Sequence, residues 1–488
     1  MGKAIMLQGT GSDVGKSVLV AGLCRVAANR GVQVLPFKPQ NMSNNAAVAI
    51  GLDGGQGEIG RAQWLQAMAC RAEPGVDMNP VLIKPESDVG AQVVVHGKVF
   101  GKASARDYQG LKAHLLDAVM ASWERLKARA ELVIVEGAGS PAEINLRDRD
   151  IANMGFATRA NAPVVLVGDI DRGGVIAAIA GTHLILPDED RRMIAGFLIN
   201  KFRGDLSLFD DGLAAITRFT GWRSFGVVPW LREAALLPSE DAVVLERSAM
   251  AGEGMLKIVV PMLPRIANFD DLDPLKAEPE VDVVFAPPGR ALPADAGLIV
   301  IPGSKATIAD LSALREFGWD RDIAAHVARG GHVFGICGGY QMLGRVVTDP
   351  LGVEGVAREA AGLGLLDFET VIEPEKTVRV SQARSVEFGT PMTGYEIHLG
   401  RTGGPDCGRP VLDIDGRPDG ATSADGRISG CYLHGLFSND AFRACFLQRL
   451  GVRSQLADHR AAVDRSLDAI AAHLETHVDV DAIFATAR

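Results

Sequence analysis

The sequence lacks several features that would place it in a special class. It has no apolar run near the roughly 18 residues that a membrane helix needs, and its first eight residues contain no signal-peptide core or cleavage site. The 6 cysteines are scattered without a C-x-x-C pair, which favours free thiols over a disulfide framework or a zinc site. Lys and Arg number 50 against 60 Asp and Glu and form no basic block, which disfavours nonspecific nucleic-acid binding. We therefore expect a cytoplasmic protein that binds neither membranes nor nucleic acids.

Length and composition fit a globular protein of at least two domains. The chain has 488 residues, 47% of them apolar and 23% charged, and this length corresponds to about three ordinary domains or two large ones. Short β-branched runs alternate with helix-length segments in both halves, which is typical of parallel strands that are covered on both faces. The runs that we predict to be strands are Ala4–Gln8, Leu132–Val135, Val164–Val167, Gly196–Ile199, Ile258–Val260, Asp282–Phe285, Leu298–Ile301 and His332–Ile336.

The fold class that this pattern predicts is α/β, with two doubly wound, mostly parallel-sheet domains. The strand pattern lapses around residues 236–256, where Pro, Ser, Gly and acidic residues collect, as they do at domain boundaries. We expect a first domain over residues 1–250, a second over 251–450, and a helical tail over 451–488 that packs on the second domain.

A glycine-rich segment near the N-terminus indicates a nucleotide site. Residues 9–17 read Gly-Thr-Gly-Ser-Asp-Val-Gly-Lys-Ser between a predicted strand and a predicted helix, the context of a phosphate-binding P-loop. Small residues let backbone N–H groups approach phosphate oxygens, the lysine supplies positive charge, and the final serine hydroxyl would bind Mg²⁺. The expected ATP-binding residues are Thr10, Gly11, Val14, Gly15, Lys16, Ser17 and, at the end of a later strand, Asn200.

A carboxylate at the end of a neighbouring strand is expected to complete the metal site. Glu136 follows the strand over 132–135 and would bind Mg²⁺ together with Ser17; the alternative is a solvated glutamate at a strand end. Asp169 and Asp171 follow the next strand in a similar position. Because doubly wound sheets bind ligands at their carboxyl edge, the sequence predicts ATP and Mg²⁺ there.

The second half carries the pattern of a thiol nucleophile. A predicted strand runs into Gly-Ile-Cys-Gly-Gly over 335–339 and then a helix, the thiol counterpart of a serine-hydrolase nucleophile elbow. Glycines two positions before and after Cys337 allow the sharp turn, whereas a buried structural cysteine would not need them. The N–H of Gly338 can point at an oxyanion, and Gly303 or Ser304, at another strand end, could supply a second donor.

A cysteine nucleophile needs a base, and the sequence offers two candidates. His434 lies at the end of a predicted strand and is followed by glycine. His398, in Gly-Tyr-Glu-Ile-His-Leu-Gly, is the rival. We favour His434 as the base.

Together these motifs resemble known families. Cys337 in its elbow, with a downstream histidine, resembles class I glutamine amidotransferases, in which the cysteine attacks the side-chain amide of glutamine and releases ammonia. The P-loop and the segment Val-Glu-Gly-Ala-Gly over 135–139 resemble the dethiobiotin synthetase branch of P-loop proteins, whose loop has the same extra residue. With Lys-Pro-Gln-Asn-Met-Ser-Asn-Asn over 38–45, Glu-Gly-Ala-Gly-Ser-Pro-Ala-Glu over 136–143 and Gly-Tyr-Glu-Ile-His over 394–398, nearly the whole chain resembles the cobyric acid synthase family.

That resemblance implies an enzyme of cobalamin biosynthesis that amidates the b, d, e and g carboxylates of adenosylcobyrinic acid a,c-diamide. ATP would activate each carboxylate as an acyl phosphate, and ammonia released at Cys337 would attack it. Because both species need shelter from water, we expect the two sites to face each other across the domain interface. The expected partners are the corrinoid and glutamine, and the oligomeric state is left open. Seven side chains are expected to contact these substrates: Asn41, Asn44, Gln56, Lys84, Asp169, Arg172 and Gln341. Each of them could instead be a turn residue or a solvated side chain.

One position departs from the usual pattern. Most class I amidotransferases carry His-x-Glu, whereas His434 is followed by Gly435 and Leu436. The absence of that acid also resembles the corrinoid-amidating subgroup. It leaves the group that orients the imidazole unidentified, and it predicts slow glutamine hydrolysis without an acceptor.

Three other interpretations share some of these motifs. A cobyrinic acid a,c-diamide synthase, or another glutamine-dependent carboxylate amidoligase, would use the same chemistry. A P-loop ATPase of the partitioning kind typically has a second lysine early in its loop, where this chain has Thr10 or Gly11, and would leave Cys337 unexplained. A second domain that only regulates the first would be excluded by glutamine-dependent ATP turnover that disappears in Cys337→Ser.

Overall fold

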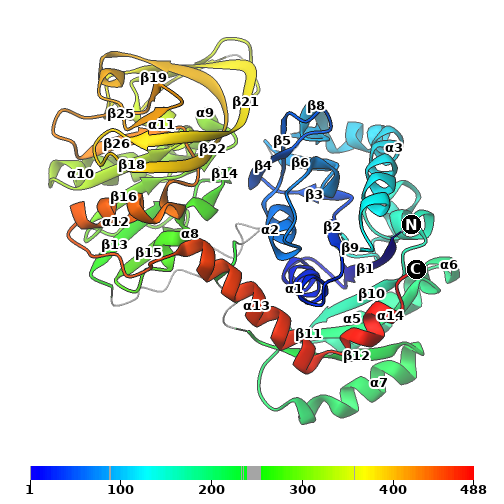
Figure 1. Cartoon of the computed structure of the whole chain (residues 1–488). Coiled ribbons are helices and arrows are strands. Elements are labelled where there is room, and N and C mark those ends of the chain that lie inside the picture. Colours follow the sequence, from blue (N-terminus) through cyan, green and yellow to red (C-terminus); the bar gives the residue numbers. More distant parts are fainter. Residues whose placement is uncertain (1, 87–89, 232–233, 235, 239–253, 357) are drawn as a thin grey trace.

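The chain folds into two α/β domains that lie side by side (Figure 1). The computed structural model describes residues 2–86, 90–231, 234, 236–238, 254–356 and 358–488. The predicted domain boundary at residues 250 and 251 lies outside the described residues. Among the helices that are described, none has the length and apolar character needed to span a bilayer.

The first domain is built on a six-stranded parallel sheet with the order β12-β11-β10-β1-β9-β2. Chain order reverses around the central strand β1, so the loop after β1 lies at a switch point, where such sheets bind ligands. The strands are β1 (Lys3–Gly9), β2 (Val34–Phe37), β9 (Leu132–Glu136), β10 (Val164–Asp169), β11 (Ile194–Phe202) and β12 (Arg223–Pro229). The helices are α1 (Lys16–Asn29), α2 (Arg61–Ala69), α3 (Ala105–Arg129), α4 (Met154–Ala160), α5 (Val175–Ile185), α6 (Asp188–Arg191) and α7 (Asp210–Thr220).

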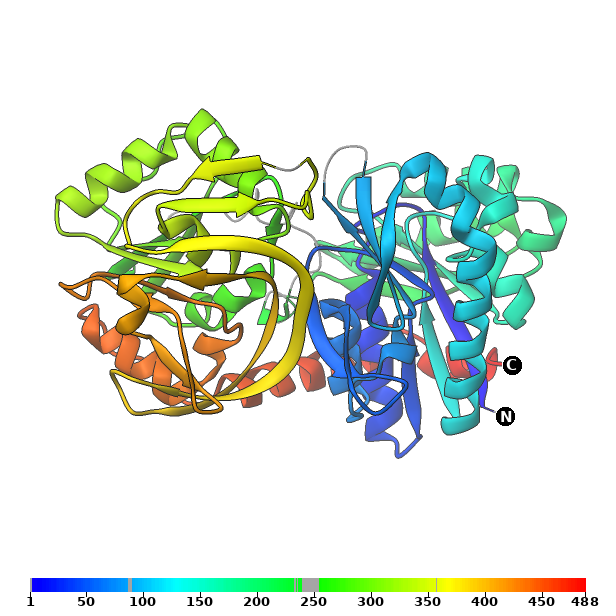
Figure 2. The same cartoon turned by 90° about the horizontal axis from the view of Figure 1, so that it is seen from above.

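Between β2 and α3 the chain forms two small additional sheets, which the strand pattern of the sequence does not predict. One has the order β3-β6-β7-β8, and the other is the antiparallel hairpin β4–β5. Their strands are β3 (Gln40–Met42), β4 (Ala46–Ile50), β5 (Gln56–Gly60), β6 (Val81–Pro85), β7 (Gly90–Val95) and β8 (Lys98–Ser104). These sheets face the second domain (Figure 2), where Ala46, Val48, Leu82 and Val94 pack against Ile397.

The second domain has a sheet with the order β15-β13-β16-β18-β26-β25, parallel except for its last strand. Its strands are β13 (Leu256–Pro261), β15 (Val281–Ala286), β16 (Leu298–Ile301), β18 (His332–Ile336), β25 (Ala421–Thr422) and β26 (Ile428–Cys431). The short pair β14 (Ile266–Ala267) and β17 (Gly303–Ser304) lies beside it. The helices are α8 (Asp273–Lys276), α9 (Thr307–Glu316), α10 (Trp319–Ala328), α11 (Gly338–Leu343) and α12 (Asp440–Arg449). All the predicted strands of both halves are confirmed, and so is the α/β fold class.

A further sheet with the order β20-β19-β21-β23-β24 carries a long hairpin, in which β22 pairs with β21. Its strands are β19 (Val346–Asp349), β20 (Arg358–Ala361), β21 (Glu369–Ser385), β22 (Pro391–Gly403), β23 (Leu412–Ile414) and β24 (Arg417–Asp419). The hairpin arches toward the first domain (Figure 2) and contacts it where Gln56 Oε1 accepts a hydrogen bond of 2.6 Å from the N–H of Val380.

The C-terminal helices pack on the first domain, so their expected place on the second domain was wrong. Helix α13 (His459–His477) crosses from the second domain to the first, followed by α14 (Val480–Ala485) (Figure 1). Buried Leu467, Ile470 and Leu474 share a core with α1 and β1. Gly22 of α1 permits this approach, since a Cβ there would lie 2.5 Å from Leu474. The sequence shows an amphipathic tail, but not which uncovered surface it will meet.

Candidate functional site

The loop after β1 has the geometry of a phosphate-binding loop. Gly15 has a φ of 91° at the start of α1, a conformation that favours glycine. The Nζ of Lys16 lies 3.0 Å from the carbonyl of Gly11 and 3.3 Å from that of Gly139, so the lysine extends over the loop. Thr10 donates its N–H to Val167 of β10 at 2.9 Å. These contacts hold the loop in shape around the position where we expect phosphates to bind.

The predicted metal ligands Ser17 and Glu136 converge. The hydroxyl of Ser17 donates to Oε1 of Glu136 at 2.8 Å, and the same carboxylate accepts from Lys38 Nζ at 2.9 Å and Gln66 Nε2 at 2.6 Å. Mg²⁺ takes oxygen ligands and is often held by one or two protein groups together with substrate phosphates. The hydroxyl of Ser17 and the carboxylate of Glu136 are oxygen ligands of this kind and therefore fit Mg²⁺. Elsewhere in the described part of the chain, no three His, Cys, Asp or Glu residues gather to hold a metal.

Asn200, Asp169 and Arg172 all lie beside the P-loop. Asn200 Nδ2 donates to the carbonyl of Val14 at 2.8 Å, so its amide supports the loop. Asp169 pairs with Lys201 at 2.8 Å. Arg172 is half-exposed and pairs with Asp13 of the loop at 3.0 Å. Asp169 and Arg172 therefore lie beside the P-loop, and their contact with substrate stays a prediction.

Cys337 lies on a strained turn between β18 and α11. Its φ of 52° and ψ of −110° are unusual for a residue with a side chain. A Cβ on Gly335 would come within 2.7 Å of the Gly339 carbonyl oxygen, and one on Gly339 within 2.0 Å of the Ile301 carbonyl oxygen. The flanking glycines are thus required by close backbone approach, as the elbow pattern predicts.

His434 is held by an acid that the sequence does not predict. Oδ2 of Asp271 lies 2.7 Å from Nδ1 of His434, and Oδ1 accepts the N–H of Gly435 at 2.7 Å. Burial alone would lower the pKa of His434, but the Asp271 carboxylate and the Cys337 sulfur raise it to about 10. With Nδ1 occupied by the acid, Nε2 is the ring nitrogen left for Cys337. The residues therefore form a Cys-His-Asp arrangement.

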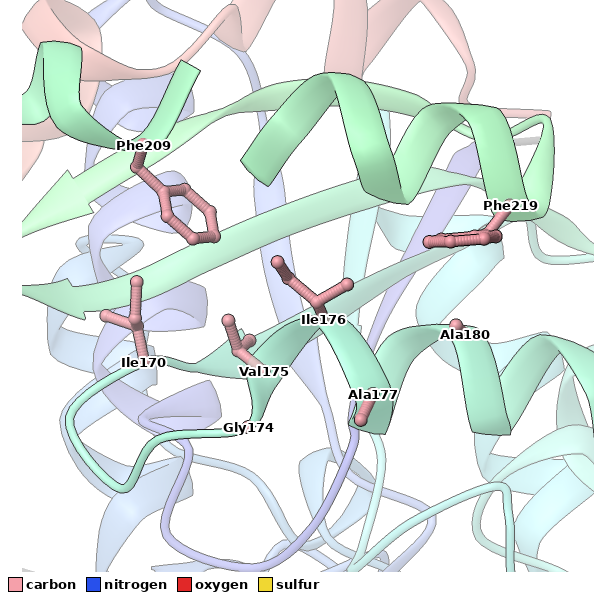
Figure 3. Close-up of a pocket in the computed structure, with 8 residues that line it drawn as sticks. All are labelled: Ile170, Gly174, Val175, Ile176, Ala177, Ala180, Phe209 and Phe219. Carbon is pink, nitrogen blue, oxygen red and sulfur yellow. The ribbon is translucent and has the colours of Figure 1, made fainter. Parts of the chain in front are cut away.

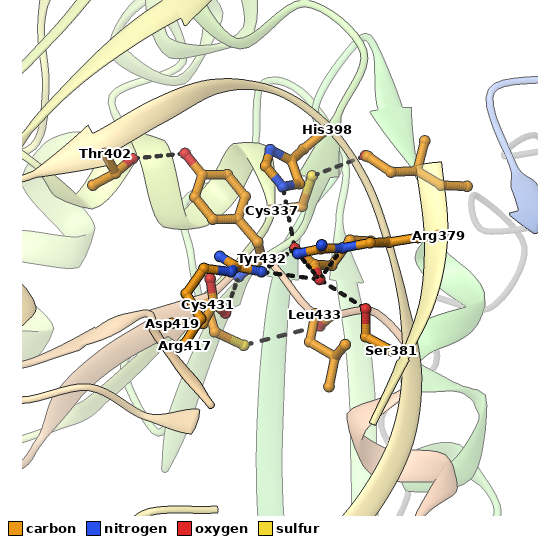
Figure 4. A network of polar contacts seen from close by, with 12 residues as sticks. Cys337, Arg379, Ser381, His398, Thr402, Arg417, Asp419, Cys431, Tyr432 and Leu433 are labelled. Atoms are coloured by element: carbon orange, nitrogen blue, oxygen red, sulfur yellow. Dashed lines mark hydrogen bonds and ion pairs between the residues drawn. The ribbon is translucent and has the colours of Figure 1, made fainter. Parts of the chain in front are cut away.

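The rival His398 lies in a different polar network (Figure 4). Its Nε2 is 3.6 Å from Glu396, and its ring stacks on Tyr432 with centroids 3.9 Å apart. Glu396 is also paired with Arg379 and Arg417. His398 lines the same cavity as Cys337, but it has no acid dedicated to one ring nitrogen as His434 has.

The two loops expected to supply oxyanion donors meet at the elbow. A Cβ on Gly338 would lie 2.9 Å from the backbone nitrogen of Ser304, and one on Gly303 would lie 3.5 Å from the His434 ring. Gly303, Ser304 and Gly338 line one cavity together with Cys337 and His434. This placement supports a donor role for these backbone N–H groups.

The cavity at Cys337 lies against the first domain. It has a volume of about 50 Å³, and Asn44 and Lys84 of the first domain line it together with Cys337 and His434. Lys84 is buried and bonds Glu58 at 2.9 Å; Glu58 also pairs with Lys376 from β21. Burial alone would raise the pKa of Glu58, but the ammonium groups of Lys376 and Lys84 lower it to about 2. A charged network from both domains therefore borders the thiol cavity.

The other residues predicted to contact substrate are placed as follows. Asn41 is buried and donates to Gln63 at 2.8 Å, and Gln56 bridges to Val380. Gln341 lines the thiol cavity and donates to the carbonyl of Leu399 at 2.8 Å. Asn41 therefore lies inside the first domain, whereas the other six residues lie beside the nucleotide loop, at the thiol cavity or at the contact between the domains.

A second hollow, of about 560 Å³, lies between α5 and α7 (Figure 3). Its lining is apolar and consists of Ile170, Gly174, Val175, Ile176, Ala177, Ala180, Phe209 and Phe219. None of these side chains can act as an acid, a base or a nucleophile. This hollow therefore offers an apolar surface and no catalytic group.

Comparisons with known proteins agree with this division. Residues 5–244 match the CobQ/CobB/MinD/ParA nucleotide binding domain, and residues 257–442 match the CobB/CobQ-like glutamine amidotransferase domain. The chain is 70% identical to the cobyric acid synthase of Mesorhizobium japonicum, with 100% of both chains covered. It is 67% identical to that of Rhizobium johnstonii, with 98% of this chain and 97% of the relative covered. Identity to the cobyric acid synthase of Brucella suis biovar 1 is 65%, with 100% of both covered.

Proposed function

The chain belongs to the cobyric acid synthase family, and from that premise we propose that it amidates a corrinoid in cobalamin biosynthesis. The acceptors are the b, d, e and g carboxylates of adenosylcobyrinic acid a,c-diamide, glutamine supplies the nitrogen, and ATP supplies the energy. The observation that carries the proposal is the thiol cavity, where Cys337 and the His434–Asp271 pair lie against Asn44 and Lys84 of the nucleotide-binding domain.

Glutamine is hydrolysed in the second domain. His434 accepts the proton of Cys337, and the thiolate attacks the side-chain amide carbon of glutamine. The imidazolium then returns the proton to the leaving nitrogen, which departs as ammonia, and water releases glutamate from the thioester. Asp271 stabilises the imidazolium throughout, because its carboxylate stays bonded to Nδ1. Backbone N–H groups at Gly338 and at Gly303 or Ser304 bind the oxyanion.

The acceptor carboxylate is activated in the first domain. The terminal phosphoryl group of ATP is transferred to a carboxylate oxygen, because hydroxide is too poor a leaving group for direct amidation. Lys16 and the loop N–H groups bind the phosphates, and Asn200 holds the loop in place. Ser17 and Glu136 would hold Mg²⁺, and that ion would supply positive charge beside the phosphates. Ammonia displaces phosphate from the acyl carbon and leaves the amide.

The corrinoid is polyanionic at its rim, and we place it between the nucleotide loop and the thiol cavity. Arg172 offers a cation on the nucleotide side. Asn44 lies on the cavity side, with its Oδ1 buried and without a protein partner among the described residues. The six cysteines are free thiols, which is consistent with our placing the enzyme in the reducing cytoplasm.

The two-site scheme is tested with Cys337→Ala. We expect this variant to lose glutamine-dependent amidation and to keep amidation driven by ammonium salts, because only the nitrogen source is removed. Cys445→Ala, at a half-buried thiol in α12, is the matched control and should behave as the parent. Loss of both activities in Cys337→Ala would contradict the scheme.

The acceptor is identified by the mass of the product. Incubation with ATP, Mg²⁺, glutamine and adenosylcobyrinic acid a,c-diamide should give a product with four carboxylates converted to amides. A preference for cobyrinic acid, with two conversions, would instead assign the chain to a,c-diamide synthesis.

A further inference from the structure

We propose that Arg61, a residue of the first domain, is a positioning residue for glutamine hydrolysis in the second domain. Its Nε lies 2.8 Å from Oδ2 of Asp270, and Asp270 directly precedes Asp271, the acid that holds His434. The inference rests on the proposed function, because it assumes that Cys337 and His434 hydrolyse glutamine.

The two neighbouring aspartates need a cation. Asp270 and Asp271 are only 5% and 4% exposed, and two buried carboxylates so close together repel each other. Burial raises the pKa of Asp270 to about 6, Arg61 opposes that rise, and Asp271 adds to it. Without Arg61, Asp270 would take up a proton or move toward water. Either change would alter the short helix Phe269–Leu272 that carries both acids.

Displacement of that helix is transmitted directly to the catalytic base. Asp271 holds the Nδ1 of His434 and the N–H of Gly435, both at 2.7 Å. Catalytic groups must stay within about 0.5 Å of their productive positions to keep their activity. A small rotation of Asp271 would therefore misalign Nε2 with Cys337.

Arg61 is itself held firmly by its own domain. It is the first residue of α2, its guanidinium lies 4.4 Å from the centre of the Trp64 ring, and its side chain is 14% exposed. Further along the same helix, Gln66 donates to Glu136 at 2.6 Å and to the carbonyl of Ser17 at 3.3 Å. One helix therefore joins the proposed metal acid to the segment that orients His434.

Other charged or titratable groups surround the pair and are unchanged by substitution of Arg61. Asp273 and Lys276 pair with each other in α8, Tyr395 of β22 stacks on His434, and Cys337 also interacts with the imidazole. Lys276 is occupied by Asp273. Arg61 is thus the cation that the described structure pairs with Asp270.

The test compares Arg61→Met, which removes the charge, with Arg61→Lys, which keeps it. We expect Arg61→Met to lower kcat for glutamine hydrolysis by about 10- to 100-fold with a smaller change in KM, because transition-state alignment is lost. Arg61→Lys should restore part of the rate. In Arg61→Met a displaced Asp271 would raise the pKa of His434 less, while burial would still lower it. The high-pH limb of the pH profile for glutamine hydrolysis should therefore move to lower pH. Ammonium-driven amidation should stay near the parent level.

The control is Lys102→Met. Lys102 also crosses the interface, where it pairs with Glu86 at 2.9 Å and donates to the carbonyl of Val353, but it does not contact the Phe269–Leu272 helix. Lys102→Met should therefore leave the rate of glutamine hydrolysis unchanged. If Arg61→Met behaves like Lys102→Met, or lowers ammonium-driven amidation to the same extent as hydrolysis, Arg61 does not position the base.

A second variant covers the case in which Arg61→Met fails to fold. Asp270→Asn removes the partner carboxylate with little change in volume, and it should lower hydrolysis in the same way. The double variant Arg61→Met, Asp270→Asn should hydrolyse glutamine no more slowly than the slower single variant, because both substitutions act through the same ion pair. Additive losses of rate would overturn the inference. The proposed function is tested separately by Cys337→Ala, since hydrolysis that survives in that variant would reject the function itself.

Discussion

At the scale of single residues, His434 contacts a carboxylate that comes from a distant part of the sequence. The His-x-Glu pattern places an acid two residues after the base, and this chain has Leu436 there. Asp271, 163 residues away in the sequence, bonds His434 instead. It comes from a short helix after β14, so Asp271 and His434 meet only when the second domain has folded.

Replacing this acid should damage glutamine hydrolysis selectively. In Asp271→Asn the imidazolium loses its carboxylate, and because burial then dominates, the pKa of His434 should fall from about 10. We expect glutamine-dependent amidation to drop by about 10²- to 10⁴-fold, as for other catalytic triads whose acid is replaced by an amide. Ammonium-driven amidation should be unchanged. A loss of less than threefold in steady-state kinetics would show that another group orients His434.

The buried Glu58 should make the interface sensitive to acid. Its pKa is lowered to about 2 by Lys376 and Lys84 against the effect of burial, so its stabilisation is present above pH 4.5 and is lost as the pH falls toward 2. At pH 7 we expect Glu58→Gln to lower the free energy of unfolding by about 3 kcal/mol, an order of magnitude set by the shift.

Urea unfolding at a series of pH values measures this effect. The difference in the free energy of unfolding between the parent and Glu58→Gln should become smaller as the pH falls below 4.5. Asp53→Asn is the control, because Asp53 pairs with Lys98 at the surface, with both side chains exposed, and should leave the unfolding curve unchanged. A difference that is constant with pH would contradict the assigned charge of Glu58.

At the scale of elements, the turn between β18 and α11 depends on backbone contacts that a methyl group would break. A Cβ on Gly339 would lie 2.0 Å from the Ile301 carbonyl oxygen and 2.7 Å from that of Pro302. These oxygen atoms belong to the backbone, so they can move away from a new methyl group only if the elbow separates from the neighbouring Gly303 loop. The elbow and the expected oxyanion donors are therefore one packed unit.

Gly339→Ala should abolish glutamine hydrolysis and lower the stability of the second domain by about 1–3 kcal/mol, the usual cost of overpacking. Gly403→Ala is the matched control, because a Cβ there meets no atom within 4 Å. Calorimetry and glutamate release check both effects. Full hydrolysis by Gly339→Ala would show that the backbone contact is dispensable.

The same scale shows what the sequence could and could not reveal. The P-loop and the elbow were predictable because each is a contiguous strand–turn–helix unit whose glycines are fixed by local geometry. Asp271, and the placement of Asn44 and Lys84 at the thiol cavity, were not, since each depends on the packing of distant segments. The long antiparallel strands β21 and β22 were also missed. Their side chains are mostly half-buried or exposed, so they lack the continuous apolar runs of the central strands.

At the scale of the whole molecule, the chain returns to its first domain after completing the second. Residues just before α13 remain with the second domain, where the N–H groups of Gln455 and Leu456 bond Glu278 at 2.8 and 3.2 Å. Helix α13 then covers α1, and the last residue, Arg488, exchanges backbone hydrogen bonds of 2.7 and 3.1 Å with Ala4 of β1. Both ends of the chain therefore belong to the nucleotide-binding domain.

The tail should consequently stabilise the nucleotide-binding domain, although it follows the amidotransferase domain in the sequence. Leu474 is 1% exposed and packs against Gly22 in the helix that follows the P-loop. Leu474→Ala should cost about 2–5 kcal/mol, as for other buried leucines, and the loss should appear in the transition that ATP protects. Ala472→Ser, at an exposed position of the same helix, should leave that transition in place. If calorimetry shows instead that Leu474→Ala lowers only a transition that ATP leaves unaffected, the tail stabilises the second domain after all, because a ligand raises the stability only of the unit to which it binds.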